Sequence, residues 1–136
     1  MRLSLALAAA ALACALPAAA SAQSEPAAIV SIYRIANGQQ VNFLKWLARQ
    51  EQISTAAGLA KSQLYIHTDG DSWDYVVIAP QTTKAQDDAV DTAARKMGMN
   101  PRQGGIELRK YIAVHTDTLA MGPTSASAYL AWLGEK

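Results

Sequence analysis

The chain has 136 residues, with 12 Lys or Arg and 11 Asp or Glu, and a formal net charge of +1 at pH 7. Charges of both signs are interspersed, which argues against nucleic acid or an anionic membrane as the main partner. The length suits one modest domain and is too short for two.

The first 22 residues have the pattern of a secretory signal peptide. Arg2 is the only charged residue, an Ala- and Leu-rich run extends from Leu3 to Leu16, and small residues end at Ala22. Two other roles stay open. One is an uncleaved membrane anchor, which Pro17 and the weak hydrophobicity of alanine disfavour. The other is lipid attachment at Cys14.

Cleavage after Ala22 would leave 114 of the 136 residues, starting at Gln23. Cys14 is the only cysteine, so the mature protein would have neither a thiol nor a disulfide. An exported chain without disulfides predicts a periplasmic or secreted protein, with no membrane contact after the signal is removed.

Two elements are predicted before residue 60. The β-branched and aromatic run from Ile29 to Ile35 predicts a strand, which ends at Asn37-Gly38. From Gln39 onward, apolar residues recur at steps of three and four. This spacing predicts an amphipathic helix that stops at Gly58.

A hairpin and a second helix are expected next. Ser62 to Thr68 and Trp73 to Ala79 have the composition of strands, and the turn residues Asp69 to Ser72 between them predict a hairpin. Either Thr82 or Thr83 is suited to cap the helix that follows.

The last part of the chain predicts a fourth strand from Ile106 to Val114 and a short helix from Ser125 to Leu133. The order strand, helix, strand, strand, helix, strand matches the ferredoxin-like α+β fold, βαββαβ, with an added C-terminal helix. We therefore predict a single domain over residues 23–136, with the strands in the spatial order 4-1-3-2.

Strand alternation divides the side chains between two faces of this sheet. Helices cover one face, where we expect aliphatic side chains such as Val30, Ile32 and Ile78. The opposite face is expected to receive Ser31, Tyr33, Tyr65, His67, Trp73, Tyr75, Val77, Tyr111, Ala113 and His115. Such a face is too aromatic to be left in water, which predicts a homodimer with two sheets closed on each other.

The only two histidines each begin a His-Thr-Asp triplet, at residues 67–69 and 115–117. A neutral histidine takes and returns a proton near pH 7, and a nearby carboxylate orients it. We assign catalytic roles to His67, His115, Tyr33, Asp69 and Asp117, and substrate-binding roles to Tyr65, Trp73, Tyr75 and Tyr111. The alternative is that each triplet only ends a strand, with its aspartate capping a turn.

Metal binding is a further alternative, because two histidines and a carboxylate can hold iron. In the expected strand order the two triplets follow opposite edge strands, about 14 Å apart, and would meet only across a dimer. We expect neither a metal nor an organic cofactor, since the sequence has no phosphate loop, dinucleotide fingerprint or mature cysteine nucleophile.

The strand Ile29 to Arg34 leading into Asn37-Gly38, the helix Val41 to Arg49 and the strand Trp73 to Ile78 resemble the dimeric α+β barrel superfamily. Within that superfamily they resemble the antibiotic-biosynthesis-monooxygenase group. The resemblance covers Ala27 to about Met121 and is one of layout, without a catalytic motif. It implies a homodimer, a small-molecule pocket inside the barrel and, in many members, activity without a bound organic cofactor. Other members bind haem, but this sequence has no matching set of haem-pocket residues.

Together these features predict a secreted, cofactor-independent lyase or isomerase that acts on a small phenolic or other aromatic compound. Either His67 or His115 would be the general base, and a tyrosine would stabilise the developing anion. The resemblance implies a second function, a cofactor-free monooxygenase of aromatic substrates. A third alternative is a non-catalytic periplasmic domain that binds an apolar ligand.

Overall fold

The computed structural model describes residues 27–70 and 72–135, so the predicted signal peptide lies outside the described residues. The elements follow the predicted order: β1 (Ala27–Ile35), α1 (Gln40–Ala56), β2 (Gln63–Ile66), β3 (Tyr75–Pro80) and α2 (Lys84–Lys96) come first. They are followed by a 3-10 turn (Pro101–Gln103), α3 (Gly104–Leu108), β4 (Ile112–Met121) and α4 (Ala126–Trp132).

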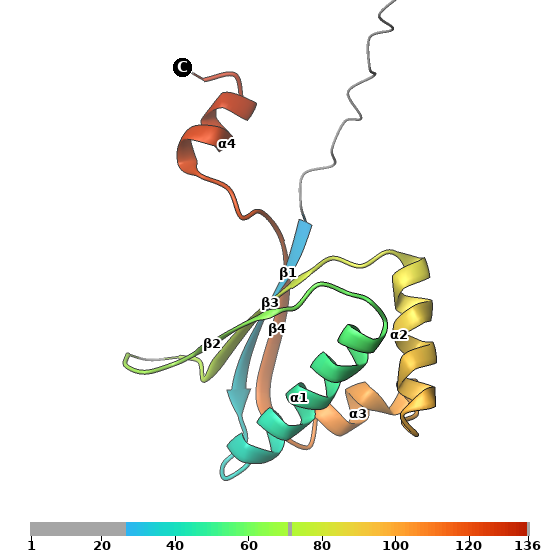
Figure 1. Ribbon diagram of the computed structural model, residues 1–136. Coiled ribbons are helices and arrows are strands. Elements are labelled where there is room, and N and C mark those ends of the chain that lie inside the picture. Colours follow the sequence, from blue (N-terminus) through green and yellow to red (C-terminus); the bar gives the residue numbers. More distant parts are fainter. Residues whose placement is uncertain (1–26, 71, 136) are drawn as a thin grey trace, which may run out of the picture.

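The four strands form one antiparallel sheet in the order β2-β3-β1-β4. This is the predicted order 4-1-3-2 written from the other edge. The ferredoxin-like fold and its added C-terminal helix are therefore confirmed, and Figure 1 shows α1, α2 and α3 on the same side of the sheet.

The prediction of a strand from Ile106 to Val114 is wrong in its bounds. Pro101 begins a 3-10 turn, whose backbone N–H at Arg102 is capped by the side chain of Asn100, and α3 continues it through Leu108. Pro is favoured at such a first position because it lacks an N–H to satisfy. The strand β4 starts later and extends to Met121, since it pairs along the whole of β1.

The side of the sheet that the helices cover is the opposite of the one expected. Phe43, Trp46 and Leu47 of α1 pack into one buried cluster with strand residues of β1 and β3. The strand members are Tyr33, Ile35, Tyr75 and Val77. The face that carries Tyr33 and Tyr75 is therefore part of the core of a single chain, and both rings pack against Phe43 of the helix.

The aliphatic face is the uncovered one. Ile32 lies opposite Val76 on β3 and Thr116 on β4, and Val30 lies opposite Ile78. Ile32 is 38% exposed and Val114 is 54% exposed. Alternation separates the two faces of a strand, but both faces of β1 are apolar, so the pattern alone could not tell which of them meets a helix.

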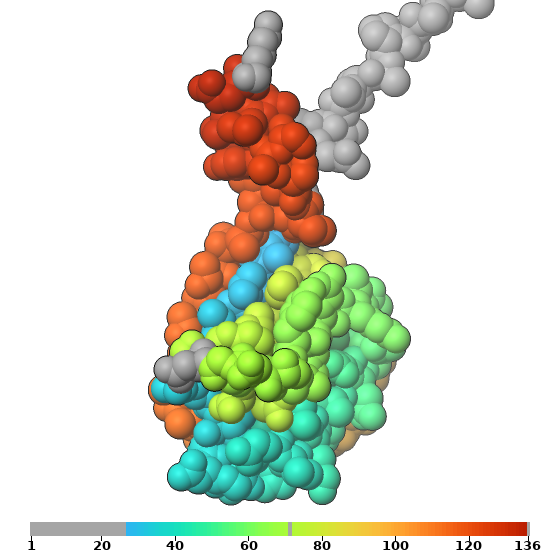
Figure 2. Space-filling view, turned by 90° about the vertical axis from the view of Figure 1, so that its left-hand side faces the viewer, coloured from blue at the N-terminus to red at the C-terminus, as the bar shows by residue number. Residues whose placement is uncertain are grey.

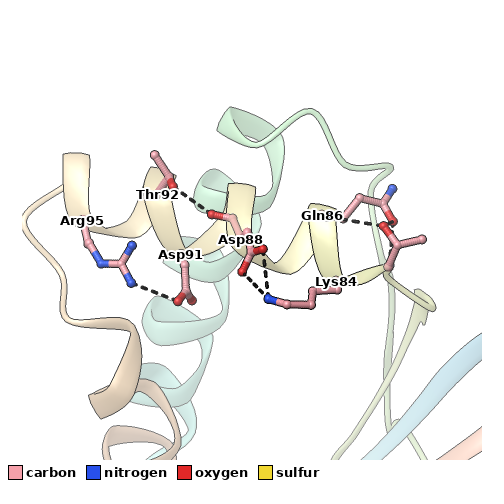
Figure 3. Close-up of polar contacts among 7 residues, drawn as sticks. Lys84, Gln86, Asp88, Asp91, Thr92 and Arg95 are labelled. Carbon is pink, nitrogen blue, oxygen red and sulfur yellow. Dashed lines mark hydrogen bonds and ion pairs between the residues drawn. The ribbon is translucent and has the colours of Figure 1, made fainter.

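The helix α2 is capped as expected and packs on α1. Thr83 and Gln86 form a capping box at its start, and Lys84–Asp88 and Arg95–Asp91 pairs at 3.1 Å run along it (Figure 3). Its inner alanines, Ala93 and Ala94, contact Ile53 of α1 in a second small core.

The C-terminal helix α4 stands apart beyond the end of the sheet (Figures 1 and 2). None of its residues is buried, and its large side chains Tyr129, Leu130 and Trp132 are 41–58% exposed. The helix therefore does not cover the sheet of its own chain. No helix in the described part of the chain is long and apolar enough to cross a membrane.

Replacing Phe43 tests how far the fold depends on the aromatic cluster. Its side chain is fully buried, and its ring lies 4.9 Å from that of Tyr33 and 5.2 Å from that of Tyr75. We expect Phe43→Ala to lower the free energy of unfolding by about 3–5 kcal/mol in urea denaturation. Val41→Ala, at an exposed position of the same helix, should change it by less than about 0.5 kcal/mol. A loss below about 1 kcal/mol for Phe43→Ala would contradict this account.

Candidate functional site

A cleft of about 980 Å³ lies between α1 and the helix-covered face of the sheet. Its floor includes Ser31, Tyr33 and Val77, and β4 contributes His115 and Asp117 at one side. The wall formed by α1 includes Trp46 and Leu47, together with polar residues further along the helix. The cleft therefore joins an apolar, aromatic surface to ionisable side chains, with Glu51 and Lys61 on its rim and His115 with Asp117 on β4, a combination typical of small-molecule sites.

The polar group of the cleft is held together by one carboxylate oxygen. Asp117 Oδ1 accepts a hydrogen bond from Ser31 Oγ at 2.6 Å and lies 2.8 Å from His115 Nε2. The strand register explains this contact, because Ser31 pairs with Asp117 and Tyr33 with His115 across β1 and β4. The predicted pairing of His115 with Asp117 is confirmed.

This geometry assigns the proton of a neutral His115. An ionised carboxylate only accepts hydrogen bonds, so Nε2 of His115 carries the hydrogen that Asp117 accepts, and Nδ1 keeps a lone pair. His115 is thereby oriented as a base with a carboxylate behind it. Ser31 bonds to the aspartate and not to the histidine, so the three residues do not form the relay of a serine hydrolase.

Tyr33 lies against the histidine. Its ring stacks on that of His115 with centroids 4.9 Å apart and planes 12° from parallel. Burial raises the pKa of the Tyr33 phenol above its ordinary value of 10.0, the neighbouring Ser31 hydroxyl lowers this pKa in part, and the charge of Asp117 raises it. Tyr33 therefore stays a neutral hydrogen-bond donor at physiological pH.

The first triplet lies elsewhere. The ring of His67 lies 5.3 Å from that of Trp73, and neither residue lines the cleft. Tyr65 pairs with Val76 on the uncovered face and donates a hydrogen bond to Gln63. The carboxylate of Asp69 accepts from the backbone N–H of Gly70 at 2.8 Å, which is the turn-capping role considered as the alternative.

The structure therefore does not bring the two triplets together on one face. Tyr65 belongs to the face that carries Ile32, whereas His115 and Asp117 share the covered face with Tyr33 and Ser31. The expectation that both histidines point to the same aromatic side is wrong. Its cause is that β2 is offset by one position relative to the assumed alternation, since Leu64 and not Tyr65 pairs with Val77.

The remaining two predicted substrate-binding tyrosines, Tyr75 and Tyr111, do not line the cleft. Tyr75 is buried against Phe43, and burial, with a smaller effect of the Asp74 charge, raises the pKa of its phenol. Tyr111 donates to Glu107 at 3.2 Å, and Glu107 pairs with Arg49 at 2.7 Å. Desolvation, with Glu107 adding to it, also raises the pKa of Tyr111.

Sequence reasoning assigned no site role to the polar residues of α1 that line the cleft, nor to Ser31 and Trp46. Ser31 was expected only as one more residue of its face, because its partner Asp117 is 86 positions away and strand register alone brings them together. Trp46 was expected only as a flanking residue of the helix, although it is 8% exposed and lines the cleft.

Within residues 27–70 and 72–135, no three His, Cys, Asp or Glu side chains lie close enough together to hold a metal ion. The sheet order also keeps His67, which follows edge strand β2, away from His115 on edge strand β4.

The fold of this chain is similar to that of several solved proteins. No protein-family model matches the chain, and no curated protein matches it in sequence. Among solved structures it is similar to SnoaB, a cofactor-independent oxygenase from Streptomyces nogalater, with 19% identity and a TM-score of 0.52. The match covers 76% of this chain and 98% of SnoaB.

Two other solved structures are similar. One is a protein from Nitrosomonas europaea with a provisional assignment as an antibiotic biosynthesis monooxygenase, at 12% identity and a TM-score of 0.52. That match covers 76% of this chain and 97% of the other. The second is a dimeric ferredoxin-like protein of unknown function from Thermobifida fusca, at 10% identity and a TM-score of 0.49, covering 74% and 93% of the two chains.

At these identities the comparisons establish the fold alone. The resemblance expected from the sequence is confirmed at that level: the chain has the ferredoxin-like fold that SnoaB and the Nitrosomonas protein share.

Proposed function

We propose that this protein is a cofactor-independent oxygenase of a small, electron-rich aromatic compound, with His115 as the general base. The observation that carries the proposal is the His115–Asp117 pair, 2.8 Å apart, at the side of an aromatic cleft. The choice of oxygen as the second reactant rests on the cofactor-independent oxygenase SnoaB, which has the same fold.

The first step of the proposed reaction is removal of a proton from the substrate. Nδ1 of His115 takes the proton, and Asp117 stabilises the imidazolium that forms. Tyr33, which is neutral and stacked on the histidine, stabilises the developing substrate anion by donating a hydrogen bond to it. The anion then reduces oxygen directly: one oxygen atom enters the product as a carbonyl in place of two hydrogens, and the other leaves as water.

A lyase or isomerase is the second candidate, and it shares this first step. The observation that favours it is the neutral Tyr33 beside His115, because a proton donor next to a proton acceptor suits the return of a proton to another atom of the substrate. The two candidates differ in whether oxygen is consumed.

We also propose that the protein acts as a homodimer joined through its uncovered sheet face. Val30, Ile32, Val76 and Ile78 form an uncharged stripe across β1 and β3, paired with Thr116 and Thr118 of β4. Apolar side chains that gather on one sheet face outside the helix layer are typical of a surface that a partner covers. Export through the predicted signal peptide would place this dimer in the periplasm or outside the cell.

The function is tested by incubating the mature protein with a panel of hydroxynaphthalenes and other phenolic compounds in air and analysing the products by mass spectrometry. We expect a product that contains one added oxygen atom. His115→Ala should lower the turnover rate about 100-fold or more, since general base catalysis contributes about 10²–10⁴-fold. His67→Ala is the matched control and should leave turnover nearly unchanged, because His67 does not line the cleft.

The same incubation without oxygen separates the candidates. Loss of product under nitrogen supports the oxygenase, and an isomerised or cleaved product formed equally well there supports the lyase or isomerase. Equal loss of activity in both histidine variants would contradict the assignment of the base. No product from any compound that quenches the tryptophan fluorescence would indicate a binding protein.

Tyr33 should make the protein sensitive to alkaline pH. The folded state holds the phenol proton more tightly than the unfolded chain, whose tyrosines ionise near pH 10. The resulting stability is fully present below pH 10 and declines as the pH rises through the raised pKa. We expect Tyr33→Phe to show a shallower decline of the unfolding free energy in this range. The unfolding free energy of the variant should still decline with pH to some extent, because the pKa values of Tyr75 and Tyr111 are also raised. An unchanged slope in the variant would refute this role.

Light scattering tests the dimer. We expect the mature protein to have twice the mass of one chain, and Ile32→Asp to have the mass of a single chain because it places a charge in the apolar stripe. Val41→Asp makes the same kind of change at an exposed position on the helix side of the sheet and should stay dimeric. Circular dichroism of each variant confirms that it is folded, and a wild-type monomer would rule the dimer out.

A further inference from the structure

Trp46 lines the cleft, and its polar atom has no role in the proton transfer described above. The indole Nε1 of Trp46 is buried, and it makes no hydrogen bond to any residue within 27–70 and 72–135. The whole side chain is 92% buried, since only 8% of its surface is exposed. Buried tryptophans normally donate this hydrogen to a partner, so an orphaned indole N–H requires an explanation.

The position of Trp46 relates this donor to the base. Trp46 comes from α1 and lines the same cleft as His115 of β4. A series of ring contacts connects them: Trp46 lies 6.0 Å from Phe43, Phe43 lies 4.9 Å from Tyr33, and Tyr33 lies 4.9 Å from His115. The packing of the core therefore holds the indole in place relative to the histidine.

We infer that the indole N–H of Trp46 binds an acceptor oxygen of the substrate, a ketone or phenolate oxygen on the aromatic skeleton that His115 deprotonates. The inference rests on the proposed function and narrows its substrate class. An indole N–H can only donate a hydrogen bond, so it selects a substrate oxygen with a free lone pair. A substrate analogue that carries hydrogen in place of this oxygen cannot accept the hydrogen bond.

Burial makes this selection effective. Nε1 is already shielded from solvent, so the donor gives up no hydrogen bond to water when it binds the acceptor oxygen. The side chains that cover Nε1 must shift when the substrate oxygen binds. A site that buries a donor in this way discriminates against analogues that leave the donor unpaired.

The test compares two ligands that differ in one oxygen, 1-tetralone with its ketone and tetralin without it. Their affinities for the mature protein are measured by quenching of tryptophan fluorescence. We expect wild type to bind 1-tetralone about fivefold to tenfold more tightly than tetralin, the effect of one net hydrogen bond. In Trp46→Phe, which keeps an aromatic ring but removes the N–H, this ratio should fall to about one. Trp132→Phe, an exposed position on α4, should keep the wild-type ratio.

A direct measurement covers the case in which Trp46→Phe does not fold. The chain has three tryptophans, so ¹⁵N-labelled protein gives three indole N–H resonances, which single Trp→Phe variants assign. In wild type the Trp46 resonance should move downfield with 1-tetralone and not with tetralin. An unchanged Trp46 resonance, an affinity ratio that survives in a folded Trp46→Phe variant, or failure of both ligands to bind wild type would overturn the inference.

His115→Ala separates this inference from the proposed function. The variant should bind 1-tetralone and tetralin with the wild-type ratio, because the donor is intact, while turnover is lost. If Trp46 fails its test and His115→Ala still abolishes turnover, the base assignment stands without the acceptor site. If the preference for 1-tetralone depends on Trp46 and no compound is turned over, the cleft binds its ligand without the proposed chemistry.

Discussion

The packing of Phe43 between two tyrosines of the sheet decides the organisation of the whole molecule. Its ring contacts both Tyr33 on β1 and Tyr75 on β3, which seats α1 on the aromatic face of the sheet. Once α1 lies there, strand alternation turns Ile32 and its aliphatic neighbours outward and directs Ser31 and Tyr33 toward the helix. The position of the cleft, and of the proposed general base His115 in it, follows from which face of the sheet α1 covers.

Register across β1 and β4 then assembles the polar group of the cleft. Ser31 and Asp117 come from opposite ends of the chain and become neighbours because every residue of β1 from Ala27 to Arg34 has a partner on β4. A shift of that pairing by one residue would move Asp117 and His115 to the uncovered face together. The site therefore depends on the length of β4, whose many ladder bonds hold the register.

Much of the fold could be predicted from the sequence, because strand and helix periods, the hairpin turn and the Thr83 cap are local signals. The pairing of His115 with Asp117 was also predictable, since two residues on one strand share a face. The choice of covered face was not, because it depends on which rings fit against Phe43 and Trp46 in three dimensions. The helical turn at Ile106 was missed because one turn of helix and a short strand have similar apolar patterns.

The isolation of α4 has a consequence for the dynamics of the chain. A helix of seven residues is too short to be stable in water without tertiary contacts, and α4 makes none that bury a residue. Its backbone amides belong to the part of the protein with the lowest local stability and will exchange with solvent far faster than those of β1 or α1. Slow amide exchange in α4 would therefore report that another surface has covered the stacked rings of Tyr129 and Trp132.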